Sequence, residues 1–325
     1  MSHPYDRLSP DTVLDAIERC GLLPNGRVLA LNSYENRVFQ IGIEDAPGVV
    51  AKFYRPDRWS DEAILEEHRF SLALAADEIP VVAPLTFAGE TLLRHAGFRY
   101  ALFPRRGGRA PELDDLSHLE WIGRFLGRIH LLGQAKPFTH RPAIDSDRLG
   151  WQARESLLAS GQIPAHHQER YAVTSQRLIE QAERQLQQIA PRRLRLHGDC
   201  HPGNILWTDA GPHFVDMDDC ANGPAVADLW MLLSGERYEM QLQLDALLTG
   251  YRTFCAFDTA ELALIEALRS LRLLHYTSWL GQRWDDPAFP LAFPWFEDEA
   301  YWQGYLADLE QQTLRMVEPA LMAYP

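Results

Sequence analysis

Two aspartates and an asparagine stand at a spacing that suits phosphate chemistry. Asp199 and Asn204 are five positions apart within His-Gly-Asp-Cys-His-Pro-Gly-Asn, and Asp216 follows Asn204 by twelve residues, at the end of an apolar run. A carboxylate can accept the proton of an attacking hydroxyl, while a second carboxylate and an amide oxygen are ligands that Mg²⁺ prefers. The pattern predicts that Asp199 is the catalytic base and that Asn204 and Asp216 hold magnesium.

The spacing favours phosphoryl transfer over the simpler interpretation that Asp199 caps its own turn. Protein kinases carry His-Arg-Asp-x-x-x-x-Asn at this place, whereas this chain has Gly198 in place of the arginine. Asp218 and Asp219 follow closely after Asp216. We favour Asp216 as the main metal ligand because it ends the strand-like run, with Asp218 as the second choice.

Lys52 is the residue expected to bind the phosphates of ATP. Only Lys52 and Lys136 of the 31 basic residues are lysines, and Lys52 follows Val-Val-Ala on a predicted strand. Lysine carries a compact point charge, which arginine does not replace where phosphates must be reached. The next helix should supply its carboxylate partner. Glu67 is the choice, Glu66 is the alternative, and either alone could instead form a surface charge pair.

Residues 32–37 form a polar turn between the first two predicted strands, where a protein kinase has a glycine-rich loop. Short polar side chains and backbone N–H groups can also cradle phosphate. We predict that Ser33 contacts ATP, and an ordinary hairpin loop is an equally good interpretation of the segment.

Three further groups should support the site. Asp228 is expected to accept backbone N–H bonds and so steady the catalytic loop, and His197 to act as a buried brace. Cys200 and Cys220 flank the two aspartates. Buried packing is the expectation for both thiols, and oxidation sensitivity is the alternative.

The elements around these residues predict two domains. Strands are expected over 28–31, 37–43, 49–54, 81–87 and 98–103, with a helix over 60–76. A Pro-Arg-Arg-Gly-Gly cluster at 104–108 marks a hinge, and helices dominate beyond it, including 116–132, 168–188, 240–254, 259–279 and 299–316. The predicted fold is α+β, with a small β-rich lobe over 1–104 and a larger, mainly helical lobe over 105–325, in the manner of protein kinases.

Composition excludes some classes of protein. The net charge of −14 argues against nucleic acid as a partner, because phosphate backbones are bound by Lys and Arg. Neither a signal peptide nor an apolar stretch long enough for a bilayer is recognisable, so a cytoplasmic protein without membrane contact is expected. The four cysteines lack the spacing of a zinc site or a disulfide framework.

The motif peptides resemble a known superfamily. His-Gly-Asp-Cys-His-Pro-Gly-Asn, His-Phe-Val-Asp-Met-Asp-Asp and Val-Val-Ala-Lys-Phe-Tyr resemble aminoglycoside phosphotransferases and choline kinase-like proteins. Longer stretches, among them Lys-Phe-Tyr-Arg-Pro-Asp-Arg-Trp from Lys52 and Arg-Trp-Asp-Asp-Pro-Ala-Phe-Pro from Arg283, look like the bacterial stress response kinase A family. The resemblance covers nearly the whole chain.

This resemblance implies a cytoplasmic serine/threonine protein kinase that acts in envelope and oxidative stress. It makes Asp199 and Asp216 the active-site aspartates, with Asn204 and Asp216 on Mg²⁺ and Ser33 at the ATP site. The expected partners are ATP and a protein with Ser or Thr, which can be the kinase itself, and a monomer is expected. A kinase for an amino alcohol or an aminoglycoside-like molecule is the rival, since the residues serve any hydroxyl. A pseudokinase is disfavoured because Lys52, Asp199 and Asn204 are all present.

Overall fold

The computed structural model describes residues 5–324, and these divide into two compact units. The first unit comprises the described residues up to Glu112 together with Phe138–Arg141 and His201–Cys220. The second comprises Leu113–Pro137, Pro142–Cys200 and the chain from Ala221 onwards. The expected lobes, 1–104 and 105–325, differ from these units because two later segments pack with the first.

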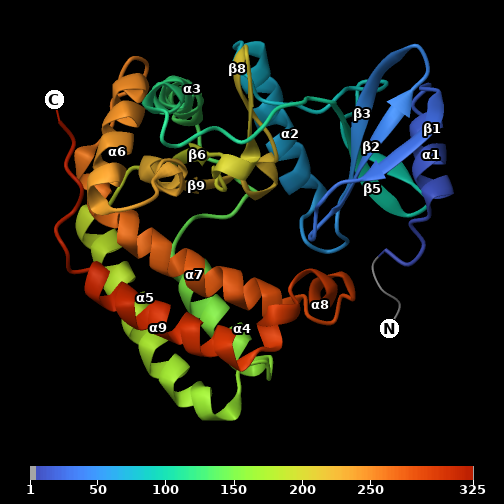
Figure 1. The fold of residues 1–325 in the computed structure, drawn as a ribbon. Coiled ribbons are helices and arrows are strands. Elements are labelled where there is room, and N and C mark those ends of the chain that lie inside the picture. Colours follow the sequence, from blue (N-terminus) through green and yellow to red (C-terminus); the bar gives the residue numbers. More distant parts are fainter. Residues whose placement is uncertain (1–4, 325) are drawn as a thin grey trace. The chain divides into compact units, whose positions relative to one another are not determined.

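The first unit is built on an antiparallel five-stranded sheet in the order β1-β2-β3-β5-β4 (Figure 1). Its strands are β1 (Pro24–Ala30), β2 (Arg37–Ile43), β3 (Ala46–Phe53), β4 (Leu93–His95) and β5 (Phe98–Pro104), and its helices are α1 (Pro10–Glu18) and α2 (Asp61–Ala76). The α1 helix begins after Ser9, whose hydroxyl accepts the Thr12 N–H, and α2 begins in the same way after Ser60. Serine caps of this kind contribute about 1 kcal/mol each.

One face of the sheet is closed by α1. Val13 and Ile17 of α1 are fully buried against Ala51 and Phe53 of β3 and Tyr100 of β5. The rings of Phe53 and Tyr100 stack with centroids 5.2 Å apart. Because side chains alternate along a strand, the residues between these on β3 and β5 project from the opposite face.

The predicted strand over 81–87 is wrong. Val81 and Phe87 form only isolated bridges, to Phe214 and Glu90, and the fourth strand of the sheet is β4 instead. Pro84 stands in the middle of the apolar segment and has no N–H to donate to a ladder, which explains why no strand forms there.

A hairpin from later in the chain belongs to the first unit. Its strands are β7 (Ile205–Thr208) and β8 (Gly211–Phe214), which pair with each other. Phe214 exchanges backbone hydrogen bonds with the segment 80–82, and Trp207 exchanges two with Arg109. These bonds explain why 201–220 groups with the N-terminal sheet rather than with the helices around it in sequence.

The second unit is mainly helical. Its helices are α3 (Leu116–Gly133), α4 (Ala153–Ala159), α5 (Gln168–Ile189), α6 (Arg237–Tyr251), α7 (Ile265–Gln282), α8 (Ala288–Ala292) and α9 (Glu299–Arg315), and its strands are β6 (Leu194–Leu196) and β9 (Ala221–Gly223). The core is formed where α4, α5, α7 and α9 meet, with Leu178, Leu271 and Trp302 fully buried. The expected helix over 259–279 is interrupted, since Thr259–Leu264 is a 3₁₀ turn that precedes α7.

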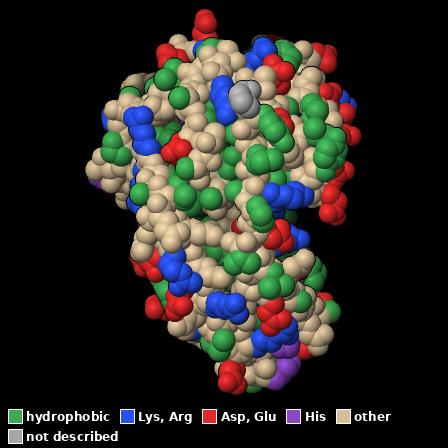
Figure 2. Space-filling view, turned by 90° about the vertical axis from the view of Figure 1, so that its left-hand side faces the viewer, with side chains coloured by type: hydrophobic (Ala, Val, Ile, Leu, Met, Phe, Trp, Pro, Cys, Tyr) green, Lys and Arg blue, Asp and Glu red, His purple; other side chains and the backbone are tan. Residues whose placement is uncertain are grey.

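The surface shows no gathering of charge by sign on the face drawn in Figure 2. Acidic and basic side chains are interspersed there with hydrophobic ones. The excess of negative charge in the sequence is therefore not concentrated on that face. Within residues 5–324, no helix combines the length and the apolar character that crossing a bilayer requires.

Candidate active site

Lys52 projects from the face of the sheet that α1 does not cover. Its neighbours Ala51 and Phe53 belong to the core under α1, and the alternation of β3 turns Lys52 to the other face, where Tyr54 packs against Ile64 of α2. The side chain is buried, with 7% of its surface exposed. A lysine this deep needs anionic partners to keep its charge.

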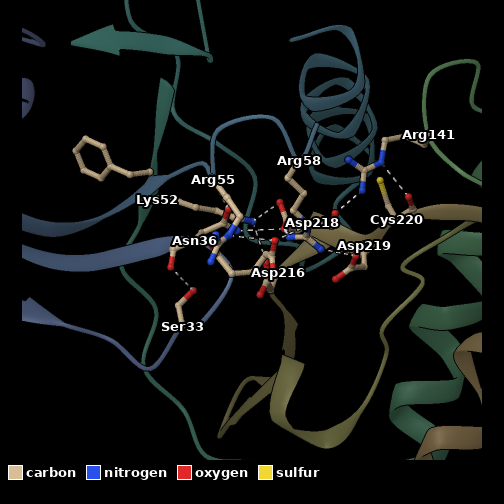
Figure 3. A network of polar contacts seen from close by, with 12 residues as sticks. Ser33, Asn36, Lys52, Arg55, Arg58, Arg141, Asp216, Asp218, Asp219 and Cys220 are labelled. Atoms are coloured by element: carbon tan, nitrogen blue, oxygen red, sulfur yellow. Dashed lines mark hydrogen bonds and ion pairs between the residues drawn. The ribbon is translucent and has the colours of Figure 1, made fainter. Parts of the chain in front are cut away.

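Two carboxylates supply that compensation (Figure 3). Lys52 Nζ lies 2.9 Å from Asp216 Oδ1 and 3.0 Å from Asp218 Oδ1. Burial by itself would lower the pKa of Lys52, but the two aspartates outweigh it and raise that pKa well above its ordinary value. The ammonium group therefore stays charged, which is what contact with a phosphate would require.

Asp218 is the most strongly held member of the cluster. It is buried and accepts hydrogen bonds from Asn36 Nδ2, 3.1 Å away, and from the guanidinium of Arg58, which also reaches Asp219. Burial would raise its pKa, but Arg58, Lys52 and Arg141 together hold it below the usual range. Asp216 differs, because 55% of its side chain is open to solvent. Asp216 is thus the carboxylate of the pair that can turn toward a ligand.

The two candidate glutamates of α2 have different surroundings. Glu66 accepts the backbone N–H groups of Thr139, His140 and Arg141, so it anchors a loop. Glu67 is buried, and no ion pair at contact distance joins it to Lys52 within the described residues. Burial raises the pKa of Glu67 to about 7, although the charge of Lys52 acts in the opposite direction. Lys52 thus pairs with Asp216 and Asp218. That Glu67, from α2, also acts as a carboxylate partner of Lys52 stays a prediction.

The β7–β8 hairpin explains the spacing of Asn204 and Asp216. Ile205 pairs with Phe214, and one step further the Val215 N–H donates to the Asn204 carbonyl over 3.0 Å. The ladder thus brings two residues that are twelve positions apart to the same end of the hairpin. Asp216 then adopts a left-handed backbone conformation with φ of +58°, which aspartate tolerates, and a 3₁₀ turn follows.

These groups form a suitable donor set for a hard cation. The half-exposed carboxylate of Asp216 and the side-chain amide of Asn204, which lie at the same end of the hairpin, offer oxygen atoms. Mg²⁺ prefers oxygen ligands and keeps several waters. The residues present therefore fit magnesium.

Ser33 lies in the turn that precedes β2. Its hydroxyl donates to the Asn36 carbonyl over 3.2 Å, and Asn36 in turn bonds Asp218 and accepts the Arg55 N–H (Figure 3). The turn is therefore attached to the Lys52 cluster. A contact of Ser33 with ATP stays a prediction.

In the second unit, Asp228 holds the loop that carries Asp199. Its buried carboxylate accepts the N–H groups of His197 and Gly198, both over 2.8 Å, and lies 3.0 Å from His130 Nε2. Burial opposes its ionisation, but His130 and these hydrogen bonds keep the pKa of Asp228 below its ordinary value. This is the support expected of Asp228, and the expected brace, His197, is fully buried.

Gly198 has a geometric reason to be glycine. Its φ is +84°, in the left-handed region that side chains rarely adopt, and it directly precedes Asp199. The turn at Gly198 lets two successive N–H groups point at one carboxylate. Gly198, which replaces the arginine of the His-Arg-Asp motif, therefore allows the backbone conformation of this loop.

Asp199 has a partner that the sequence pattern did not indicate. Arg272 of α7 places Nη1 2.7 Å from Asp199 Oδ1, within the same unit. Its side chain is 42% exposed, against 21% for Asp199. The carboxylate proposed as the base thus lies beside a positive charge.

Sequence reasoning missed Arg58, Asn36, Arg141 and Arg272. Arginine is so frequent in this chain, 29 residues in all, that no single one stands out. A sequence signal for Arg58 was present, because Arg58 belongs to the Lys-Phe-Tyr-Arg-Pro-Asp-Arg-Trp peptide. The other three become visible only when distant segments meet.

A match to a family model covers most of the chain. Residues 27–265 match the model of the phosphotransferase enzyme family, APH. Stress response kinase A of Escherichia coli (strain K12) is 46% identical over 321 residues, which is 99% of this chain and 97% of that protein. The serine/threonine protein kinase RdoA of Salmonella typhimurium has the same identity and coverage. The chain is a kinase that belongs to the phosphotransferase enzyme family and, within it, to the stress response kinase A family.

Solved structures agree on the fold. The amicoumacin kinase hAmiN, in complex with AMP-PNP, Ca²⁺ and Ami, superposes with a TM-score of 0.70 at 19% identity, and the match covers 94% of both chains. A microcompartment-associated aminopropanol kinase gives a TM-score of 0.65 at 20% identity, over 89% of this chain and 93% of that one. At this identity the likeness shows the α+β kinase-like fold alone, which confirms the predicted fold class.

Proposed function

We propose that this chain is an ATP- and Mg²⁺-dependent serine/threonine protein kinase, monomeric and cytoplasmic, that acts in a stress response. One observation carries the phosphotransfer part of this proposal. Lys52 is a buried lysine held by Asp216 and Asp218, and such a charge cluster is what a nucleotide phosphate and its metal require. The names of the relatives support the protein substrate and the stress response.

Each residue has a defined part in the reaction. The acceptor oxygen forms a bond to the γ-phosphorus, the bond between that phosphorus and ADP breaks, and the acceptor proton passes to the Asp199 carboxylate. Lys52 would bind the α- and β-phosphates, with Glu67 and Ser33 at the nucleotide site. Asn204 and Asp216 would hold magnesium, which neutralises phosphate charge when bound.

A small-molecule kinase is the second candidate. Two proteins that share the fold are named as kinases of small molecules, one of aminopropanol and one of amicoumacin. The segment between Asp216 and Pro224 is also short and contains a 3₁₀ turn and β9, which leaves little room for an activation loop. The choice between the two candidates therefore depends on the acceptor.

A transfer assay with γ-labelled ATP and Mg²⁺ tests the proposal. It is run on the protein alone, with a generic protein substrate, and with a panel of amino alcohols and amino sugars. We expect label on Ser or Thr of protein, and loss of at least about 100-fold in rate for Asp199→Ala with nucleotide binding retained. Asp216→Ala should lose Mg²⁺-dependent nucleotide binding as well.

Two results would contradict the proposal. Label on a small alcohol only would overturn the substrate class and leave the phosphotransfer site in place. An Asp199→Ala protein that transfers phosphate at the wild-type rate would show that Asp199 is not the base.

A further inference from the structure

The charge next to Asp199 has the wrong sign for a cationic acceptor. Arg272 Nη1 lies 2.7 Å from Asp199 Oδ1, and close to half of the arginine side chain is open to solvent. Any acceptor whose hydroxyl reaches Asp199 must approach this guanidinium. An amino alcohol would bring a second positive charge to the same place, where like charges repel.

The face of α7 around Arg272 offers no acidic group to offset this charge. The neighbours of Arg272 three and four positions away are Arg269, His275, Tyr276 and the buried Leu268, and Trp279 follows two turns on. The single acidic residue of α7, Glu266, already pairs with Arg269 over 3.2 Å and accepts from Gln312. This face is basic and aromatic although the whole chain carries a net charge of −14.

We propose that Arg272 selects an acidic peptide, in which the acceptor Ser or Thr is flanked by Asp or Glu, and disfavours cationic acceptors. This inference rests on the proposed role of Asp199. A substrate carboxylate can bind the planar guanidinium in bidentate fashion and so replace Asp199 as its partner. Asp199 Oδ1 is then released to accept the hydroxyl proton. A basic peptide cannot make this exchange, so Arg272 stays on Asp199.

Matched peptides test this selection. Three peptides share one Ser and differ only in flanking residues, which are Asp and Glu, Ala and Gln, or Lys and Arg. We expect wild-type kcat/KM to be at least about tenfold higher for the acidic than for the basic peptide. Arg272→Ala should bring the three values together, and Arg272→Glu should reverse the order. Arg177→Ala, an exposed arginine of α5, is the control that keeps the wild-type preference.

The outcomes separate this inference from the proposed function. Equal use of all three peptides by the wild type, or an unchanged preference in Arg272→Glu, overturns the role of Arg272 and leaves the protein kinase intact. Transfer to amino alcohols with no peptide labelled overturns both. Circular dichroism and nucleotide binding of each variant show that it is folded.

A second inference comes from a separate cluster in the second unit. His166 and His167 both direct Nε2 at Glu299 Oε1, over 3.1 Å and 2.8 Å, and the two imidazole rings are only 4.1 Å apart. The three ligand atoms lie within 4.8 Å of one another. The two adjacent histidines thus share one carboxylate oxygen, which lies 133 and 132 positions away from them in the sequence.

We infer that these three residues bind a divalent transition metal of the zinc class. Two imidazole nitrogens and one carboxylate oxygen are a common ligand set for such ions, and bonds of about 2.0 to 2.2 Å suit atoms that are this close. His166 and Glu299 are exposed, so water can complete the coordination. The bound ion would join the turn at 165–167 to the start of α9.

Metal titration of the untagged, EDTA-treated protein without nucleotide tests this site. We expect one equivalent of Zn²⁺ by calorimetry, a Co²⁺ absorption spectrum, and a higher midpoint of thermal unfolding with metal. His166→Ala and Glu299→Gln should each lose all three signals, whereas His95→Ala of β4 should keep them. Absence of saturable binding, or equal binding by the variants, would show that the cluster is only a hydrogen-bonded pair of histidines.

Discussion

At the scale of single residues, the site depends on how charges are compensated. Lys52 remains charged in a buried position because Asp216 and Asp218 lie within 3.0 Å of its ammonium group. Arg58 in turn occupies the other oxygen of Asp218. Asp216 is left as the more exposed carboxylate, so the cluster has one member fixed for structure and one available for a ligand.

The two lysines of the chain form a natural pair of variants. Lys52→Ala should weaken nucleotide binding and lower the transfer rate by at least about tenfold, because it removes the expected phosphate contact and one of the two cations that hold the buried Asp218. Lys136 is exposed, and Lys136→Ala should change neither. Both are measured by nucleotide titration and by the transfer assay. Equal losses of nucleotide affinity and transfer rate in the two variants would show that Lys52 has no specific role in nucleotide binding.

Glu67 should make stability depend on pH. Burial raises its pKa from 4.5 to about 7, so between these values the folded protein keeps a proton that the unfolded chain releases. Stability should therefore fall as pH rises from about 4.5 to about 7, by on the order of 2 kcal/mol from this group. Glu67→Gln should flatten that part of the profile. Urea unfolding at pH 5 and pH 7.5 measures the free energy of unfolding of the wild type and of Glu67→Gln. The same change in this free energy between the two pH values in both proteins would contradict the prediction.

At the scale of elements, glycines in α3 help to position the loop that carries Asp199. Cβ atoms added at Gly123 and Gly127 would lie 2.1 Å from the Leu247 carbonyl oxygen and 2.5 Å from the Tyr251 carbonyl oxygen, so the backbones of α3 and α6 touch (Figure 1). This close contact places His130 at 3.0 Å from both the Tyr251 hydroxyl and Asp228. Asp228 then holds the turn before Asp199.

A glycine pair separates this effect from general helix propensity. Gly127→Ala should destabilise the protein by about 1 to 3 kcal/mol and lower the transfer rate, because α3 and α6 must move apart. Gly304→Ala in α9 meets nothing within 4 Å and should stabilise by about 0.5 to 1 kcal/mol. Chemical denaturation measures both. A Gly127→Ala protein as stable and active as the wild type would disprove the coupling.

At the scale of the whole molecule, the fold protects its thiols. Cys200, Cys220 and Cys255 are buried, and burial raises the pKa of Cys200 and Cys220. Oxidants react with the thiolate, so the two cysteines beside the aspartates are poor sensors in the folded state. This favours the packing interpretation of these residues over the redox alternative.

Thiol labelling of the native protein provides a direct check. Cys20 is half-buried and should react first with iodoacetamide at neutral pH, while the other three should react only after unfolding in urea. Mass spectrometry of the peptides identifies the labelled sites. Rapid labelling of Cys200 or Cys220 in the folded protein would restore the sensor hypothesis.

The sequence by itself determined the class of chemistry, because that information is local. The spacing of Asp199 and Asn204 is set by a short loop, and that of Asn204 and Asp216 by one hairpin, so both are readable as motifs. The α+β class also follows from the change in periodicity after the Pro/Gly cluster at 104–108. The predicted strand over 81–87 does not form because Pro84 interrupts the apolar run and has no N–H to donate.

Only the tertiary structure decided which charges meet. The pairing of Lys52 with Asp218 joins residues 166 positions apart, and that of Asp199 with Arg272 joins a loop to a distant helix. Neither pairing follows from a local sequence pattern. Several acidic residues could have paired with Lys52, and any of the 29 arginines could have paired with Asp199. Both pairings depend on the packing of a whole unit, which brings the groups together and, around Lys52 and Asp218, excludes the water that would otherwise screen them.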